Sequence, residues 1–204
     1  MTILSSLQNL PFSQACENNK APILRVLNRE LAHCRGVLEI GSGTGQHACY
    51  FAEKLPHLSW QPTDIAQNLG MLHARCAAYA GDNLLPEVAL DVCDNPWPLA
   101  IPDAVFTANS LHIMPFEAVT ALFEALARQA KHPVVLAVYG PFNYNGSYTS
   151  DSNARFDQWL AQQHPLSAIR DFEAVDALAQ QAGFTLSNDH EMPANNRLLV
   201  WRNS

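Results

Sequence analysis

The sequence lacks the long apolar segments and the clustered basic residues that mark membrane proteins and nucleic-acid-binding proteins. No apolar run among its 204 residues approaches the length that spans a bilayer, and no basic flank precedes an apolar stretch at the N-terminus. Charged residues make up only 15% of the chain, the net charge is −7, and Lys and Arg form no run. We therefore predict a cytoplasmic protein with no membrane partner and no nucleic-acid partner.

Cysteine and histidine give no sign of a disulfide framework or of a metal site. The five cysteines are odd in number, and no two of them form a Cys-x-x-Cys motif. The eight histidines show no paired spacing of the kind that metal ligands have. We predict that no metal is bound and that the thiols lie in a reducing compartment.

A predicted strand, a glycine-rich turn and a predicted helix follow one another near the N-terminus. Val37–Ile40, in which three apolar residues flank Glu39, is predicted to be a short buried strand, and Gly41, Gly43 and Gly45 follow it at alternate positions. The segment Ala48–Leu55 then has apolar residues at helical spacing. Such a corner binds nucleotides in α/β proteins, although its glycine spacing differs from the G-x-G-x-x-G of dinucleotide-binding proteins. A dinucleotide site and a turn without a ligand remain the alternatives at this point.

Polar residues end the strands that are predicted after this corner. We expect strands over 58–64, 88–92, 104–110 and 134–139, with helical patterns between them, which predicts an α/β doubly wound sheet. Their tips carry Asp64, Asp91, Asn109 and Tyr139, and ligands bind at this edge of such sheets. Asp64 lies about twenty residues after the glycine turn, a spacing that favours a bond to a ribose diol. A helix N-cap is the alternative role for Asp64, and Asp91 is placed to meet an adenine amine.

The rest of the chain is expected to complete a single domain over residues 1–204. The first helix is predicted to begin at Pro22, and a helix capped by Ser152 is predicted within a polar and aromatic segment over 141–170. Residues 1–22 and 141–170 are interpreted as a cap on the substrate side, with an ordinary surface excursion as the alternative for 141–170. Strands over 184–191 and 198–201 are predicted to form an antiparallel hairpin.

Taken together, these motifs resemble those of class I S-adenosylmethionine (SAM)-dependent methyltransferases. More narrowly, the sequence is similar to the DUF938 family, which is similar to the methyltransferase-like 26 proteins. The resemblance covers nearly the whole chain and is carried by the blocks Leu38–His47, Trp60–Asp64, Ala89–Val92, Ala108–Ile113, Tyr139–Phe142, Ser152–Ala154 with Phe156–Asp157, Arg170–Asp171 and Glu191–Asn196. The sequence departs from the family's pattern near the N-terminus. The family usually has an Arg before the Asn-Lys pair and an acid after it, whereas Asn18 and Ala21 stand at these two positions.

The resemblance implies a Rossmann-like, seven-stranded, mostly parallel sheet whose last strand is antiparallel. It implies SAM as cofactor and S-adenosylhomocysteine (SAH) as product. The implied cofactor-binding residues are those of the glycine motif, the ribose acid, the adenine pair and one polar residue after the fourth strand: Glu39, Gly41, Ser42, Gly43, Gly45, Asp64, Asp91, Val92 and Asn109.

The residues that contact the methyl acceptor are predicted less specifically than those that bind the cofactor. His112 follows the fourth strand and is the candidate base, with packing against the cofactor or the next helix as the alternative. Further substrate-side candidates are Asn19, Tyr139, Asn143, Asn195 and Asn196, of which the last two also suit a turn. No Asn-Pro-Pro-Tyr motif follows the fourth strand, which argues against methylation of nucleobase amines and favours a small-molecule acceptor. A SAM-binding protein without catalysis and a nicotinamide oxidoreductase remain the alternatives.

Overall fold

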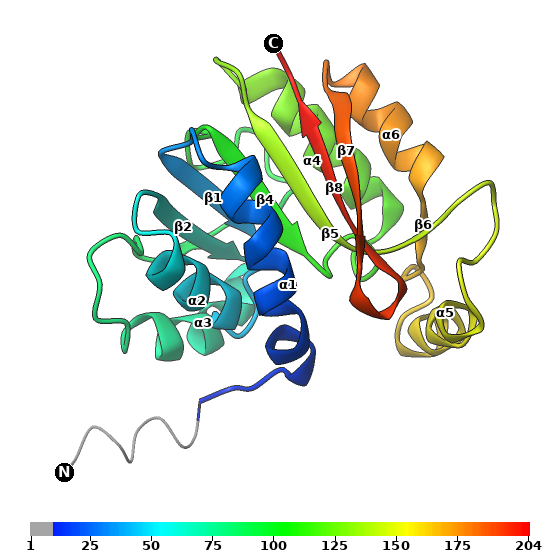
Figure 1. Cartoon of the computed structure of the whole chain (residues 1–204), viewed down its shortest axis with the longest axis horizontal. Helices are drawn as coiled ribbons and strands as arrows, with labels where there is room; N and C mark the ends of the chain where they lie inside the picture. Colours follow the sequence, from blue (N-terminus) through cyan, green and yellow to red (C-terminus); the bar gives the residue numbers. More distant parts are fainter. Residues whose placement is uncertain (1–9) are drawn as a thin grey trace.

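The computed structural model describes residues 10–204, and a single twisted sheet organises them (Figure 1). Its strands are β1 (Gly36–Ile40), β2 (Ser59–Asp64), β3 (Val88–Ala89), β4 (Ala104–Ala108), β5 (Val135–Asn143), β6 (Arg170–Asp171), β7 (Thr185–Met192) and β8 (Asn196–Arg202). The helices are α1 (Gln14–Glu30), α2 (Gln46–Lys54), α3 (Leu69–Cys76), α4 (Phe116–Gln129), α5 (Asp151–Gln163) and α6 (Phe172–Gln181). Two short 3-10 helices, η3 (Ala66–Asn68) and η4 (Pro193–Asn195), lie in connections.

The strand order confirms the predicted doubly wound sheet. Seven strands follow the path β3-β2-β1-β4-β5-β8-β7, and the two-residue β6 pairs with the end of β5. The first five strands are parallel, whereas β8 runs antiparallel to both β5 and β7, as the resemblance implied. The chain moves from β1 outward to β3 and then returns to β4 on the other side of β1. This reversal opens a crevice at the carboxyl ends of β1 and β4, where such sheets bind ligands.

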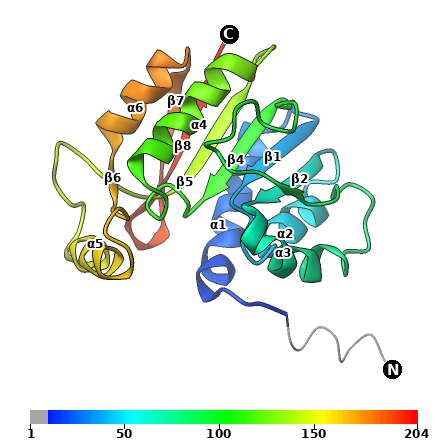
Figure 2. The ribbon, with the colours of Figure 1, turned by 180° about the vertical axis from the view of Figure 1, so that it is seen from behind.

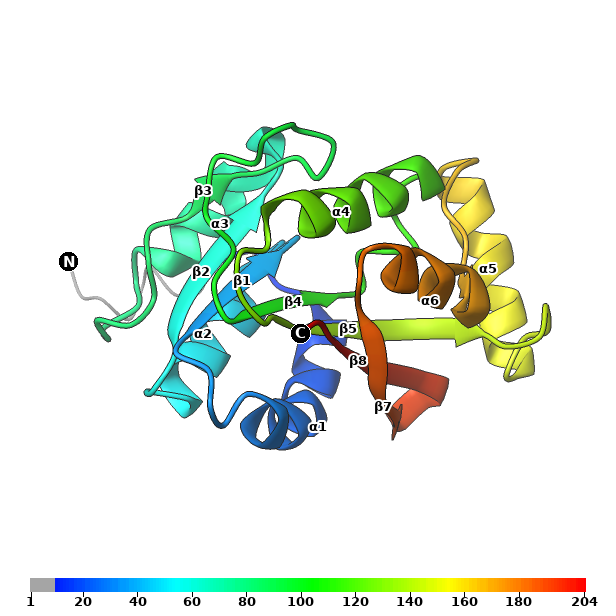
Figure 3. The ribbon, with the colours of Figure 1, turned by 90° about the horizontal axis from the view of Figure 1, so that it is seen from above.

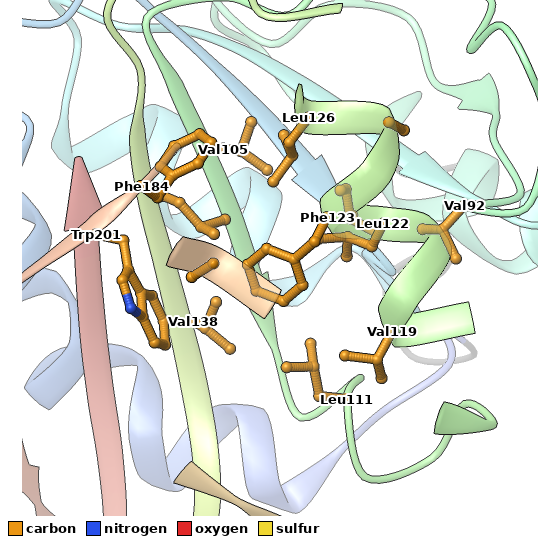
Figure 4. Close-up of a cluster of buried hydrophobic side chains, with 14 of the residues drawn as sticks. Val92, Val105, Leu111, Val119, Leu122, Phe123, Leu126, Val138, Phe184 and Trp201 are labelled. Atoms are coloured by element: carbon orange, nitrogen blue, oxygen red, sulfur yellow. The ribbon is translucent and has the colours of Figure 1, made fainter. Parts of the chain in front are cut away.

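Helices cover both faces of the sheet, and each face has its own apolar core (Figures 2 and 3). On one face, α1 and α2 pack against the sheet around Phe51, Trp60 and Phe106, which are fully buried. On the other face, Phe123 of α4 and Trp201 of β8 meet edge to face with ring centroids 6.4 Å apart (Figure 4). These cores hold the strands in register, so that their carboxyl ends form one edge.

The first helix begins earlier than predicted. The structure starts α1 at Gln14, with Pro22 inside the helix, whereas the sequence predicted a start at Pro22. Ser13 caps the helix by accepting a hydrogen bond from the N–H of Cys16. The Gln46 side chain then bonds both the N–H and the carbonyl of Ser13. This contact comes from another element, so the local sequence pattern does not reveal it.

Other boundaries also differ from the prediction. β3 stops at Ala89 because only Thr63 and Asp64 of β2 pair with it. β5 continues through Pro141 to Asn143, because β8 pairs with it as far as Pro141 and β6 pairs with its last residues. The polar segment therefore leaves the sheet only after Asn143. The cap of α5 is Ser150, whose hydroxyl accepts the N–H of Asn153, and not Ser152.

The structure places part of each predicted cap segment at the carboxyl edge. Both α5 and the first turns of α1 lie at the end toward which β1, β4 and β5 point (Figure 1). The predicted cap over 1–22 includes residues 1–9, which lie outside the described residues. Within residues 10–204, no helix is both long enough and apolar enough to cross a membrane.

Candidate active site

A cavity of about 1350 Å³ lies at the carboxyl edge of the sheet. The loops after β1, β2, β3 and β4 and residues of β5 form its floor, and residues of α1, α5 and the β7–β8 connection form its walls. Sites for a single drug-sized ligand are usually about 300–1,000 Å³. The cavity therefore has room for a cofactor and a second small molecule.

The glycine turn lies on the floor of this cavity. Gly41, Gly43 and Gly45 have φ angles of 73°, 54° and 72°, which glycine adopts without steric cost. A Cβ on Gly41 would lie 2.6 Å from the hydroxyl oxygen of Ser110, so close packing also requires glycine there. A Cβ on Gly43 would meet nothing within 4 Å, because this residue lines the open cavity. Gly45 does not line it and packs against α3 instead.

Side chains from the neighbouring strands hold the turn in place. Thr63 of β2 donates its hydroxyl to the carbonyl of Glu39 at 2.7 Å. Thr107 of β4 donates likewise to the carbonyl of Ile40 at 2.8 Å. The N–H of Ser42 donates to the carbonyl of Thr63 at 2.9 Å, which continues the ladder beyond the strand. The turn is thus fixed from both sides before any ligand binds.

Glu39 lies beneath the turn and does not line the cavity. Its carboxylate accepts a hydrogen bond of 2.8 Å from the indole N–H of Trp60. Burial raises the pKa of Glu39 to about 7; hydrogen bonds from Trp60 and Ser42 oppose this rise, and the charge of Asp64 adds to it. The structure therefore places Glu39 among the residues that support the turn.

Asp64 faces the cavity from the tip of β2. Its carboxylate accepts the N–H of Gly43 at 2.7 Å, the N–H of Ile65 at 2.8 Å and the amide of Asn68 at 2.8 Å. A carboxylate has about four acceptor positions, so one position remains for a ligand. Asp64 thereby joins the glycine turn to the start of the next helical segment.

Asp91, Val92 and Asn109 also line the cavity. Asp91 is exposed and uses one carboxylate oxygen to accept the N–H of Cys93 at 2.9 Å. Asn109 follows β4 with a φ of 58°, and its N–H donates to the carbonyl of Tyr139 at 2.8 Å. Asn tolerates this left-handed geometry better than most residues, which explains an Asn at this point of the chain.

His112 lines the cavity and is 5% exposed. Its ring meets Phe156 of α5 edge to face at 5.4 Å, and its carbonyl accepts the N–H of Ala168 at 3.0 Å. Burial lowers the pKa of His112 to about 4, the charge of Arg170 acts in the same direction, and Asp157 opposes it. The imidazole is therefore neutral near pH 7.

A second buried histidine, His47, lines the cavity and was not among the predicted site residues. His47 lies in the first turn of α2, and its Nε2 is 2.6 Å from Oδ1 of Asn19. Burial lowers the pKa of His47 to about 4. Burial raises the pKa of Tyr139, and hydrogen bonding to Asn19 and Asn196 opposes that rise. The position of His47 directly after the glycine turn was the available signal.

The structure brings three of the five substrate-side candidates to the cavity, namely Asn19, Tyr139 and Asn196. Asn143 does not line it, and its buried Oδ1 has no hydrogen-bond partner among the described residues. Asn195 has a φ of 57° and belongs to the turn before β8, as its alternative interpretation proposed. No group of three or more possible metal ligands occurs within residues 10–204.

Comparison with known proteins adds a family and a fold. The family described as "Protein of unknown function (DUF938)" matches residues 10–203. The structure is similar to the S-adenosylmethionine-dependent methyltransferase SibL in its apo form, with a TM-score of 0.76 and 19% identity over 92% of this chain and 55% of that chain. PigF with SAH gives a TM-score of 0.74 and 16% identity over 88% of this chain and 54% of that chain.

A third similar structure is an O-methyltransferase family 2 protein from Planctomyces limnophilus DSM 3776 in complex with apigenin. Its TM-score is 0.79, with 14% identity over 92% of this chain and 57% of that chain. The chain spans a little over half the length of these solved proteins. At such identities the comparison shows the fold, which is that of class I methyltransferases.

Proposed function

Because the chain belongs to the DUF938 family and has the class I methyltransferase fold, we propose that it transfers a methyl group from SAM to a small-molecule acceptor. The observation that carries this proposal is the bond between Asp64 and the N–H of Gly43 at the cavity floor. This hydrogen bond holds the glycine turn, which suits the methionyl part of SAM, next to Asp64, which suits its ribose. The SAH in PigF and the apigenin in the Planctomyces protein support the same cofactor and an acceptor of that size class.

The lining residues fit SAM in chemistry. Gly41, Ser42 and Gly43 leave room for the methionyl part, because Gly43 faces the open cavity and has no side chain. The remaining acceptor position of Asp64 binds one ribose hydroxyl, and the amide of Asn68 lies beside it. Asp91 and Val92 frame the adenine, with the free carboxylate oxygen of Asp91 accepting from its amine. Asn109 closes the floor from the β4 side.

The chain's contribution to methyl transfer is mainly orientation. SAM supplies a methyl group on a positively charged sulfur, and in-line alignment of the nucleophile lowers the barrier by several kcal/mol. When the acceptor nucleophile carries a proton, the neutral imidazole of His112 receives it. No hydrogen bond joins its ring nitrogens to another side chain among the described residues, so they are available.

Titration calorimetry with SAM, SAH and NAD tests the cofactor. We expect heat from SAM and SAH and none from NAD, whereas binding of NAD alone would favour an oxidoreductase. The variant Asp64→Ala should weaken SAH binding at least about tenfold, since a charge-assisted bond is worth roughly 1.5–3 kcal/mol. Asp82→Ala, at an exposed loop position, is the control and should bind as the wild type does.

A SAM-binding protein without catalysis is the second candidate. It would give the same calorimetric result and release no SAH with any acceptor in a broad panel. Once an acceptor is found, His112→Gln should lower kcat and remove an acid limb from its pH profile. An unchanged profile would exclude His112 as the base.

A further inference from the structure

The cavity has a region that the proposed SAM contacts do not use. We call it the acceptor-side region and define it by Asn19, His47, Tyr139, Phe156, Trp159 and Asn196, all of which line the cavity. Asn153 connects its two walls, because this residue of α5 donates to the carbonyl of Asn195 at 3.3 Å, directly before Asn196. The first turns of α1 and the whole of α5 lie at this end of the molecule (Figure 1).

This region carries no charged side chain. Among the described residues that line the cavity, the Asp and Glu side chains are Asp64 and Asp91 alone, both on the cofactor side, and Lys and Arg are absent. Residues 1–9 contain no Asp, Glu, Lys or Arg in the sequence. Among the described residues, His47, His112 and His164 line the cavity. His47 and His112 are neutral near pH 7, since burial lowers the pKa of each to about 4, and the exposed His164 lies at the C-terminal end of α5, outside the acceptor-side region. A charged acceptor would have to lose water here without gaining a counter-charge, which is strongly unfavourable.

One wall of the region is an aromatic surface. The rings of Phe156 and Trp159 are stacked, with centroids 5.8 Å apart and planes inclined by 15°. Trp159 remains 51% exposed although it lines the cavity, and Ile113, which lines the cavity from the loop after β4, is 58% exposed. Aromatic rings prefer offset-stacked or edge-to-face partners, so a flat ring would cover this surface well.

Other residues of the region supply uncharged hydrogen-bonding groups. Asn19 from α1, His47 from α2, Tyr139 from β5 and Asn196 from β8 converge there. All four can donate or accept a hydrogen bond without carrying charge. They are suited to a hydroxyl or carbonyl oxygen on an otherwise apolar molecule.

We propose that the acceptor is an uncharged aromatic compound that bears a hydroxyl group, with its ring against Phe156 and Trp159 and its oxygen toward Asn19, His47, Tyr139 and Asn196. This inference rests on the proposed methyl transfer, since it assigns the second molecule of that reaction. The same surfaces reject carboxylate, phosphate and ammonium groups on an equally flat ring.

The test uses three probes that share one ring system and differ in charge. 2-Naphthol, 2-naphthoate and 2-naphthylmethylammonium are titrated by calorimetry into the full chain saturated with SAH. We expect 2-naphthol to bind at least about tenfold more tightly than either charged probe, because an unpaired charge is costly to bury. Comparable affinity for a charged probe, or no binding of 2-naphthol, would overturn the inference.

Two variants locate the binding surface. Trp159→Ala should weaken 2-naphthol binding at least about fivefold through loss of ring contact. Leu166→Ala is the matched control, because Leu166 is 52% exposed and does not line the cavity. Gln163→Arg, which places a cation at the end of α5 in the lining, should raise the affinity for 2-naphthoate.

Fluorine NMR of the protein labelled with 5-fluorotryptophan gives a direct readout of position. Trp60, Trp97 and Trp201 are at most 3% exposed, so 2-naphthol should shift mainly the Trp159 signal, which Trp159→Phe assigns. Calorimetry with SAH alone separates the two proposals. Failure to bind SAH would remove the methyl-transfer proposal, whereas SAH binding with equal affinity for charged and uncharged probes would remove only the acceptor class.

Discussion

Replacing Glu39 by Gln tests whether a buried carboxyl under the glycine turn is protonated in the folded protein. The pKa of Glu39 is raised from its ordinary value of 4.5 to about 7, first by burial. The folded state therefore holds a proton at pH values where the unfolded state has released it. Because a group with a raised folded pKa binds more protons when folded, its contribution to stability falls as pH rises from about 4.5 to about 7.

The size of the effect follows from this difference in pKa. One pKa unit corresponds to about 1.4 kcal/mol, so the penalty from ionising Glu39 reaches about 3 kcal/mol above pH 7. Between about pH 5 and about pH 8, the wild type should lose roughly 2.5 kcal/mol through this group. Gln keeps the shape and can still accept the indole N–H of Trp60, but it has no proton to lose.

Urea unfolding of the wild type and of Glu39→Gln at the two pH values measures this quantity. The variant should gain about 2.5 kcal/mol relative to the wild type on going from the lower pH to the higher. Glu124→Gln is the control, because the Glu124 side chain is 60% exposed and its pair with Arg128 lies at the surface. SAH affinity should change little, since Glu39 does not line the cavity. An equal difference in unfolding free energy at both pH values would refute the assigned protonation.

Four other substitutions probe the turn, the cavity and the core by the same unfolding measurement. Gly41→Ala combines a φ of 73° with a Cβ that would lie only 2.6 Å from the Ser110 hydroxyl oxygen, so it should lower the free energy of unfolding by at least about 2 kcal/mol. The Cβ of Gly43→Ala would meet no atom within 4 Å, so this substitution should cost about 1 kcal/mol. Equal losses of stability in the two variants would contradict the packing argument. The pKa of His112 is lowered to about 4 in the folded protein, so the unfolded state takes up the proton first as the pH falls below about 6.5, and the wild type loses stability. His112→Gln has no such proton to take up and should avoid a loss of about 2 kcal/mol near pH 5. Phe106→Ala removes a fully buried ring and should cost about 3–5 kcal/mol, so a loss below about 1 kcal/mol would contradict the place of this ring in the core.

The sequence predicted those parts of the fold that depend on local spacing. The sheet, the antiparallel hairpin and the positive φ angles at Gly41, Gly43 and Gly45 follow from alternating apolar segments and from the glycines themselves. The meeting of Asp64 with this turn follows from topology, because the ends of adjacent parallel strands lie side by side.

The parts that sequence reasoning missed depend on contacts between distant segments. The start of α1 is set by Gln46, which is 33 residues from Ser13, and no periodic pattern marks that contact. His47 faces the cavity because α1 packs over it and provides Asn19 as its partner. Asn143 was predicted at the acceptor side, whereas pairing with β6 extends β5 to this residue and its side chain does not line the cavity. The methyltransferase-like 26 assignment stays a prediction.

The attachment of the N-terminal segment to the glycine turn links two regions that differ in sequence and in role. Arg75 donates to the carbonyl of Thr44 in the turn at 2.8 Å and to the carbonyl of Pro11 at 2.6 Å. Gln46, the first residue after the turn, holds Ser13 and also donates to Glu17 at 2.7 Å. A ligand that stabilises the turn therefore stabilises the docked segment. By thermodynamic reciprocity, the docking of this segment raises the ligand's affinity by the same factor.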